Sequence, residues 1–315
     1  MKSKDNKIYE LITQFPESIK QSYEIKTDKL KKKFKKIVVV GMGACYTSGL
    51  VLQQFLKHEI DVEIFQDYDF ELDKDTLLIL LSYSGNTREV LKIFNKFKNK
   101  KNNLLVLTSG GKLLSLAKKE KIRTIQVPAN LHPRFTFSQV FFPAISILEK
   151  SKIIKSKKKL IQSIIFCLIK NEKFLDVEGK KISVKLKNKT PLFYASDYFY
   201  PVAYRLQASL EEDAKVICHS NKITELFHNE LEALPNNKFY PILILDKRQI
   251  RDFKKQIGFF KRYIKNFKEF KFYNYTKEKR MFLGFYFTEF LSYYLSKLEK
   301  INIRETPISD EIKKK

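Results

Sequence analysis

The chain has 315 residues, of which 43% are hydrophobic, enough for one large domain or two of medium size. Its formal net charge is +26, but the charge comes mainly from scattered lysines, while arginine, the usual reader of bases and phosphates, is scarce. We therefore expect no nucleic-acid partner. No apolar run is long enough to span a bilayer and no apolar signal core opens the chain, so we expect a cytoplasmic protein without a membrane partner.

The three cysteines show neither a disulfide framework nor a metal-ligand spacing. They are Cys45, Cys167 and Cys218. An odd and sparse set of this kind fits a reducing compartment. We expect neither a metal nor a cofactor.

Strands and helices alternate along the first half of the chain. Residues 1–35 are expected to be helical, with a break at Pro16. Buried strands are expected at residues 37–40, 62–65, 77–81, 104–108 and 122–127. This alternation favours an α/β fold, a doubly wound parallel sheet with helices on both faces.

The pattern resumes after a charged region. Residues 151–188 carry a helix at 160–168 between polar stretches, and we interpret them as a connecting segment. Further strands are expected at 192–195, 216–218, 242–245 and 270–273, and further helices at 200–212, 226–234 and 277–298. The sequence thus predicts a first domain at 1–150 with a leading helix, a connection at 151–188 and a similar α/β domain at 189–315.

Two unusual loops follow the first and third strands. One runs from Gly41 through Gly43 to Cys45, and the other from Ser82 to Thr87. In the common strand order 2-1-3-4-5, strands one and three are neighbours where the order reverses, so both loops would face one crevice. Glycine at 41 and 43 lets the backbone approach a ligand closely.

The second loop carries three hydroxyl groups, from Ser82, Ser84 and Thr87, directly before an amphipathic helix. Ser84 or Asn86 can cap that helix, whose first N–H groups point at the loop. Ordinary capping explains one hydroxyl but not three, so we favour a bound phosphate group. The first loop lacks the third glycine of a dinucleotide fingerprint, and the second lacks the Gly-Lys-Ser/Thr of a Walker loop.

These residues resemble a known family. Ser-x-Ser-Gly-Asn-Thr after an apolar strand is the signature of the sugar isomerase (SIS) domain. The wider set resembles the archaeal-type bifunctional phosphoglucose/phosphomannose isomerases through Phe15-Pro16-Glu17, Thr108-Ser109-Gly110-Gly111-Lys112-Leu113, Pro133-Arg134-Phe135, Glu211-Glu212-Asp213-Ala214-Lys215, Phe227-His228-Asn229-Glu230 and Glu305-Thr306-Pro307-Ile308. The resemblance implies two SIS domains in tandem and a homodimer.

The resemblance also implies two proton-transferring residues. Aldose–ketose isomerisation moves a proton between adjacent carbons through an enediolate, and the family match places the base at Glu212. The flanking Glu211 and Asp213 depart from the usual Asn-Glu-Asn, and a charged helix end is the alternative interpretation. The match places the ring-opening group at His228, donated in the family from the partner subunit.

Three further positions come from the same match. Arg134 is the candidate for stabilising the enediolate, with ionic surface decoration as the alternative. Lys315 aligns with a lysine near the substrate, although Lys313 and Lys314 fit nearly as well. The first loop departs from the usual Gly-Met-Gly-Gly-Ser-Gly, because Ala44, Cys45 and Tyr46 replace its last three residues, and a thiol is a weaker donor than the serine hydroxyl. A nucleophilic Cys45 is the alternative interpretation.

We therefore expect an isomerase that interconverts glucose 6-phosphate, and mannose 6-phosphate as well, with fructose 6-phosphate. Its phosphate and substrate contacts would come from Gly43, Ala44, Cys45, Ser82, Ser84, Thr87 and Lys315. The alternatives are a non-catalytic SIS regulator that senses a sugar phosphate, and an isomerase of amino-sugar phosphates.

Overall fold

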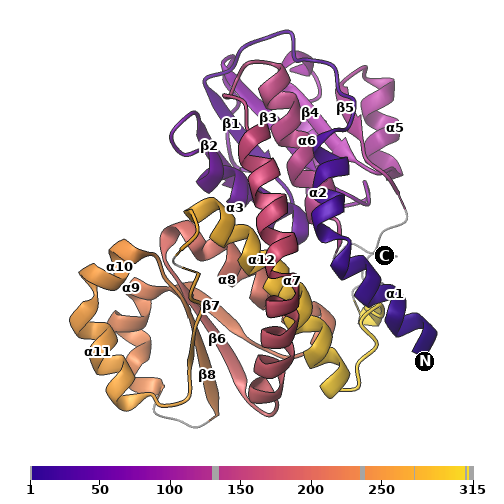
Figure 1. Cartoon of the computed structure of the whole chain (residues 1–315). Coiled ribbons are helices and arrows are strands. Elements are labelled where there is room, and N and C mark those ends of the chain that lie inside the picture. Colours follow the sequence, from indigo (N-terminus) through magenta and orange to yellow (C-terminus); the bar gives the residue numbers. More distant parts are fainter. Residues whose placement is uncertain (1, 130–134, 235–237, 273, 309–310, 312–315) are drawn as a thin grey trace. The chain divides into compact units, whose positions relative to one another are not determined.

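A computed structural model describes residues 2–129, 135–234, 238–272, 274–308 and 311 (Figure 1). The chain forms two compact units. We call Gln14–Ile165 the N-terminal unit, and Met1–Thr13 with Phe166–Lys315 the C-terminal unit.

The N-terminal unit is built on a five-stranded parallel sheet in the order β2-β1-β3-β4-β5. Its strands are β1 (Lys36–Val40), β2 (Asp61–Phe65), β3 (Thr76–Leu81), β4 (Leu104–Thr108) and β5 (Arg123–Gln126). Every residue of β3 and β4 is buried, as expected for central strands that are covered on both faces. The predicted strand order is confirmed, and with it the neighbouring positions of β1 and β3.

Helices cover both faces of this sheet. They are α2 (Phe15–Tyr23), α3 (Ala44–Leu56), α4 (Arg88–Phe97), α5 (Gly111–Lys119) and α6 (Phe137–Lys150), with a short 3₁₀ helix at Lys101–Asn103. Apolar side chains of α4 and α5 form one core with alternate residues of the strands. On the other face, α3 packs on β1 and α6 on β4.

The C-terminal unit repeats this plan with four parallel strands in the order β7-β6-β8-β9. They are β6 (Thr190–Ala195), β7 (His219–Lys222), β8 (Phe239–Ile244) and β9 (Lys268–Glu269). The expectation of two doubly wound parallel-sheet domains is confirmed. Two strand predictions were wrong in position, because residues 216–218 and 270–272 lie beside the edge strands β7 and β9 and not in them, while residue 273 lies outside the described residues.

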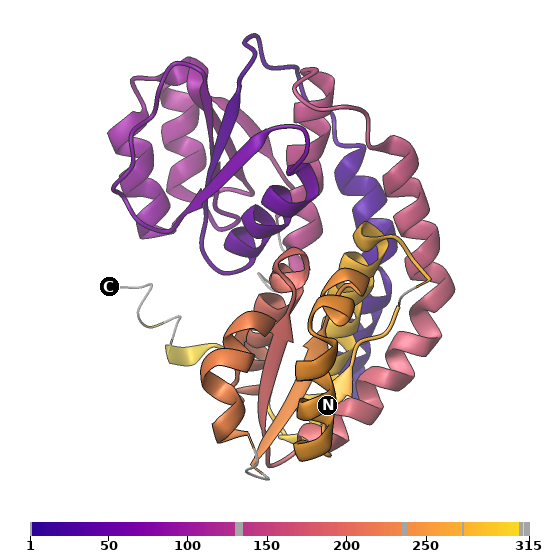
Figure 2. The ribbon, with the colours of Figure 1, turned by 90° about the vertical axis from the view of Figure 1, so that its left-hand side faces the viewer.

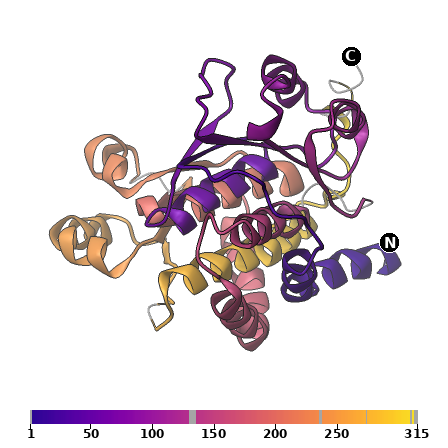
Figure 3. The ribbon, with the colours of Figure 1, turned by 90° about the horizontal axis from the view of Figure 1, so that it is seen from above.

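The helices of this unit are longer and more varied. They are α1 (Lys2–Thr13), α7 (Lys158–Leu186) from Phe166 onward, α8 (Tyr200–Ser209), α9 (Ile223–Glu225), α10 (Lys247–Asp252), α11 (Lys254–Tyr263) and α12 (Lys277–Leu298). Short 3₁₀ helices lie at Asp197–Phe199 and Leu231–Ala233. Figures 2 and 3 show α7 on the outer side of α12, away from the strands of this sheet.

The leading helix packs with the C-terminal unit, and the helical prediction for residues 1–35 fails beyond Tyr23. Ile8 and Ile12 of α1 are buried, and the Tyr9 ring contacts Phe290 and Tyr293 of α12. The Tyr9 hydroxyl also donates to Asp176 of α7 over 3.0 Å. The segment expected to connect the domains is mostly this one helix, α7.

In the part of the chain that the structure describes, no helix combines the length and the apolar surface that a membrane span requires. Among the same residues, no cluster of histidine, cysteine and acidic side chains could hold a metal ion.

Candidate functional site

The loops that follow β1 and β3 touch each other in the N-terminal unit, as the strand order requires. The Tyr83 N–H group donates a hydrogen bond to the Cys45 thiol. A Cβ atom built on Gly41 would lie 3.1 Å from the Leu81 carbonyl oxygen and 2.7 Å from the Cys45 Cβ atom. Glycine at position 41 therefore permits the close approach of the two strand ends.

The hydroxyl groups of the second loop are partly satisfied within the loop. Ser82 Oγ and Thr87 Oγ1 share a hydrogen bond of 2.8 Å, and Ser82 Oγ accepts from the Gly85 N–H group over 3.1 Å. Ser84 Oγ accepts from the Asn86 N–H group over 3.3 Å. Ser82 is buried and Ser84 is exposed. Ser82 thus shapes the loop, while Ser84 faces outward.

The prediction that Ser84 or Asn86 caps α4 was wrong, because the Asn86 side chain accepts a hydrogen bond from the next helix, α5. Thr87 is the N-cap of α4, and its side chain makes no capping hydrogen bond to that helix. Asn86 Oδ1 instead accepts from the Lys112 N–H group at the start of α5 over 3.0 Å. The Gly85 carbonyl accepts from the Leu113 N–H group over 2.9 Å. The loops after β3 and β4 are therefore joined through the backbone of α5.

Two glycines with positive φ make this junction possible. Gly85 has φ +67°, and a Cβ atom there would lie 1.8 Å from the Gly110 carbonyl oxygen. Gly111 has φ +70°, and a Cβ atom there would lie 2.3 Å from the Ser84 carbonyl oxygen. A side chain at either position would force the two loops apart.

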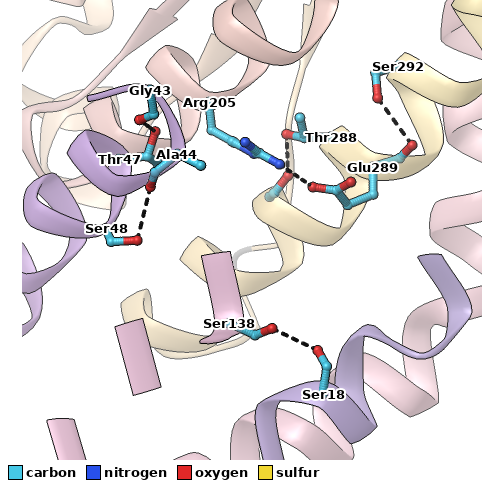
Figure 4. A network of polar contacts seen from close by, with 11 residues as sticks. Ser18, Gly43, Ala44, Thr47, Ser48, Ser138, Arg205, Thr288, Glu289 and Ser292 are labelled. Carbon is cyan, nitrogen blue, oxygen red and sulfur yellow. Dashed lines mark hydrogen bonds and ion pairs between the residues drawn. The ribbon is translucent and has the colours of Figure 1, made fainter. Parts of the chain in front are cut away.

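Cys45, a residue expected to contact the substrate, is buried at the start of α3. Burial raises the pKa of its thiol to about 11, although the hydrogen bond from Tyr83 opposes this effect. The thiol is therefore protonated near neutral pH and is not an activated nucleophile. Just before it, Gly43 is the exposed N-cap of α3, and its carbonyl and that of Ala44 accept from Thr47 and Ser48 (Figure 4).

Glu212, the predicted base, lies in a π-helical turn, Leu210–Ala214, that follows α8 in the C-terminal unit. The turn ends at Lys215, which has a left-handed backbone with φ +57°. Lys215 Nζ donates to the Glu212 carbonyl and, over 2.8 Å, to the Glu305 carbonyl. Lys215 thus joins the Glu212 turn to the final segment of the described chain.

A buried ion pair lies beside this turn. Arg205 donates to Glu289 over 2.9 Å, and both side chains are almost fully buried (Figure 4). Burial opposes the charge of Arg205, but Glu289, Asp213 and Glu212 together raise its pKa above the ordinary range. The guanidinium group therefore stays charged close to the predicted base.

His228 lies in a second π-helical turn, Leu226–Glu230, and is exposed. In the same turn, Glu230 accepts from Asn221 Nδ2 over 2.6 Å and from the Tyr194 hydroxyl, which fixes the turn to β7 and β6. Burial and the Glu230 carboxylate raise the pKa of Tyr194 above its ordinary range. π-Helical turns are rare and frequent at functional sites. In the described residues there are two, and each carries one predicted catalytic residue.

Arg134 and Lys315 lie outside the described residues. No role was expected for Arg205 or Glu289, and Lys215 was noted only as the last residue of a family motif. Arginine is scarce in this lysine-rich chain, and that scarcity is a signal that could have singled out Arg205. No sequence signal pointed to Glu289, because it reaches Arg205 from a helix 84 residues further along the chain.

Comparison with known proteins follows the same division of the chain. Residues 29–141 match the model of the SIS domain, and residues 176–315 match that of the bacterial phospho-glucose isomerase C-terminal SIS domain. The solved C-terminal domain of glucosamine-fructose-6-phosphate aminotransferase from Francisella tularensis superposes with a TM-score of 0.74 at 16% identity, covering 95% of this chain and 98% of that one. The fold is thus that of a tandem SIS-domain protein.

Two curated relatives show to which group of SIS-domain proteins this chain is similar in sequence. A bifunctional phosphoglucose/phosphomannose isomerase from Thermoplasma volcanium is 28% identical over 92% of this chain and 95% of its own. A D-glucosamine-6-phosphate 4-epimerase from Sulfolobus acidocaldarius is 30% identical over 68% of this chain and 69% of its own. The chain belongs to the bifunctional phosphoglucose/phosphomannose isomerase family of SIS-domain sugar phosphate isomerases, as its motifs indicated.

Proposed function

We propose that this protein interconverts glucose 6-phosphate, and also mannose 6-phosphate, with fructose 6-phosphate through an enediolate. The observation that carries the proposal is the similarity to the isomerase from Thermoplasma volcanium over nearly the whole of both chains. Among the described motif residues, Gly43, Gly85 and Gly111 have positive φ, and Glu212 and His228 lie in π-helical turns, which supports the assignment of a site to these loops and turns.

The phosphate group is assigned to the loop after β3. Ser84 is exposed, Thr87 is half-buried at the start of α4, and Ser82 holds Thr87 in place. The N–H groups of the first turn of a helix attract an anion, and Thr87 does not cap them. Gly43, Ala44 and Cys45 are assigned to the sugar, with a neutral thiol as a weak hydrogen-bond donor. Lys315 is assigned to the substrate's negative charge.

The proton transfer is assigned to Glu212. Its backbone is held by Lys215, and its carboxylate is the kind of group that can take up and return a proton between adjacent carbons. Arg134 is assigned to the negative charge that develops on the enediolate oxygens. Carboxylate and imidazole groups suffice for this chemistry, so the proposal includes no metal or cofactor.

His228 is assigned to ring opening, as a proton donor to the ring oxygen. Its exposed position on a turn that is fixed to the sheet suits contact with another molecule. We therefore include a homodimer in the proposal, with His228 acting in the site of the partner subunit.

The test uses protein treated with a chelator and incubated separately with glucose 6-phosphate and mannose 6-phosphate, with products followed by NMR. We expect fructose 6-phosphate from both. Glu212→Gln should lower kcat by at least about a hundredfold, because a general base contributes about that much or more. Glu211→Gln is the matched control, since it removes the neighbouring exposed carboxylate. Equal activity of wild type and Glu212→Gln would refute the assignment of the base.

The same assay tests a second candidate function, because the relative from Sulfolobus acidocaldarius is a D-glucosamine-6-phosphate 4-epimerase. Glucosamine 6-phosphate is therefore the third substrate to test. Conversion of this compound alone, with no fructose 6-phosphate from the other two, would replace the first proposal by the second. Tight binding of a sugar phosphate without turnover of any would instead indicate a sensor.

A further inference from the structure

The outer face of α7 is unlike the rest of the described surface. Nine large hydrophobic side chains are exposed in the described residues, and five of them lie on this one helix. They are Phe166, Ile169, Phe174, Val177 and Val184, each between 53% and 69% exposed. Contiguous apolar surface of this kind marks an interaction site more often than single exposed residues do.

The other exposed residues between Phe166 and Lys185 are all lysines. They are Lys170, Lys173, Lys180, Lys181 and Lys185. The three acids of this stretch have partners: Glu172 accepts from Tyr286, Asp176 from Tyr9 and Tyr294, and Glu178 from Lys268. Glu178 also lies 3.7 Å from Lys181 and balances part of that charge. The outer face therefore combines apolar and positive side chains without an exposed acid.

This face is not needed to complete the core of its own unit. Leu168, Leu175, Ile182 and Leu186 point the other way and are buried. On that inner side a Cβ atom built on Gly179 would lie 2.7 Å from the Phe290 Cβ atom, so α7 and α12 are in close contact. The outer apolar side chains remain exposed after this packing is complete.

The spacing of the exposed residues is that of a helix seam. Six of them follow one another at alternating intervals of four and three residues: Phe166, Lys170, Lys173, Val177, Lys180 and Val184. Such a repeat lets a second helix pack along the first, each side chain fitting between those of the partner. Lysine occupies three of the six positions, so a helix that packs there is most favourable with an acidic side chain opposite each lysine.

We propose that the outer face of α7 binds an amphipathic helix of another protein, with apolar and acidic residues along its seam. A second copy of this face fits poorly, because a two-fold contact would place lysines opposite lysines. A membrane surface fits less well, because lysines lie within the apolar row and not only at its margins. The net charge of +26 strengthens the attraction of an acidic partner.

The probe is a synthetic helical peptide of about three heptads. It carries leucine opposite Phe166, Val177 and Val184 and glutamate opposite Lys170, Lys173 and Lys180, and it is made in both chain directions. We expect saturable one-to-one binding of one peptide to the full chain in fluorescence anisotropy, weakened by salt. Lys170→Glu/Lys173→Glu/Lys180→Glu should weaken binding at least about a thousandfold, since each of the three reversals costs about tenfold or more.

The matched control is Lys254→Glu/Lys255→Glu/Lys265→Glu, which changes the net charge equally at exposed sites on and after α11. Circular dichroism checks that both variants are folded. Equal loss of binding in both variants, or no binding by wild type, would overturn the proposal. A dimer that dissociates on Phe166→Ser/Val177→Ser would also overturn the proposal, because it identifies a second copy of the chain as the occupant. Binding to phosphatidylserine vesicles that is lost in Lys170→Glu/Lys173→Glu/Lys180→Glu but not in the control would do the same, because it identifies a membrane.

Discussion

At the scale of single residues, the stability of the C-terminal unit depends on a buried pair of opposite charges. Arg205 and Glu289 exchange a hydrogen bond with side-chain exposures of 3% and 7%. The negative charges of Asp213 and Glu212 also interact with the Arg205 guanidinium group and raise its pKa. Removing one member of such a pair leaves an uncompensated charge out of water, so the pair ties the stability of this unit to the surroundings of the predicted base.

The first prediction concerns this pair. Arg205→Met should lower the free energy of unfolding by about 3–5 kcal/mol in urea titrations, the usual cost of breaking a buried ion pair. Arg205→Met/Glu289→Met should recover a large part of the loss, because neither charge is then left alone. The exposed Arg248–Asp252 pair provides the control, and Arg248→Met should cost less than about 1 kcal/mol. Similar costs for Arg205→Met and Arg248→Met would argue against a critical buried pair.

The second prediction concerns Cys45 and pH. Its pKa is raised to about 11 in the folded protein, mainly because the thiol is buried. The folded value exceeds the unfolded one, so the stabilising contribution is complete below the unfolded pKa and is lost as pH rises through about 11. Wild type should lose on the order of 2–3 kcal/mol more than Cys45→Ser over this range, because each tenfold change in an ionisation equilibrium corresponds to about 1.4 kcal/mol.

Urea unfolding of both proteins at several pH values measures this difference. Lysines and tyrosines titrate in the same range, but they are common to both proteins and cancel in the comparison. Parallel pH curves for wild type and Cys45→Ser would show that the thiol ionises as readily in the folded as in the unfolded chain.

At the scale of elements, the junction of the loops after β3 and β4 depends on glycine. Gly85 and Gly43 both have positive φ, but only Gly85 is crowded, since no atom lies within 4 Å of a Cβ atom built on Gly43. The two positions therefore separate backbone strain from steric conflict.

The third prediction uses this contrast. Gly85→Ala should lower the free energy of unfolding by at least about 1 kcal/mol more than Gly43→Ala, because it adds a clash with the Gly110 carbonyl to the strain that both share. Thermal unfolding of the two variants measures the difference. If Gly43→Ala lowered the free energy of unfolding as much as Gly85→Ala, the crowding at Gly85 would not contribute to stability.

Elements were predictable from sequence to the degree that they are covered on both faces. The bounds of β4 and α12 agree with the expected ranges 104–108 and 277–298, since a buried apolar run has few alternatives. The strand β7 was misplaced because it is an edge strand that pairs only with β6 and reads His-Ser-Asn-Lys. The neighbouring residues 216–218 are more apolar and were therefore predicted to form the strand, but they directly follow Lys215, whose backbone is left-handed.

At the scale of the whole molecule, the N-terminal residues are divided between the two units. Ile12 in α1 belongs to the C-terminal unit and Ile19 in α2 to the N-terminal unit, and neither is exposed at all. Seven residues of sequence thus separate two side chains that support different cores.

The fourth prediction follows from this division. Ile12→Ala and Ile19→Ala should each cost about 2–5 kcal/mol, the usual loss for a buried isoleucine. Amide hydrogen exchange should show that Ile12→Ala weakens protection in β6, β8 and α12, whereas Ile19→Ala weakens it in β1, β3 and α6. Loss of protection in the same strands for both variants would contradict the assignment of α1 to the C-terminal unit.

The sequence by itself determined the central strands and the family, because these depend on local apolar runs and on short contiguous motifs. The strand order, and with it the neighbouring loops after β1 and β3, was expected from the common order of such sheets and is the one observed. Only the tertiary structure decided that α1 packs against α12, that Asn86 serves α5, and that Arg205 meets Glu289 across 84 residues. These contacts join segments far apart in the chain, and the sequence offers each of them many chemically similar partners: other aromatic rings, other backbone N–H groups and other acidic side chains. Packing selects one of them, and no local pattern records that choice.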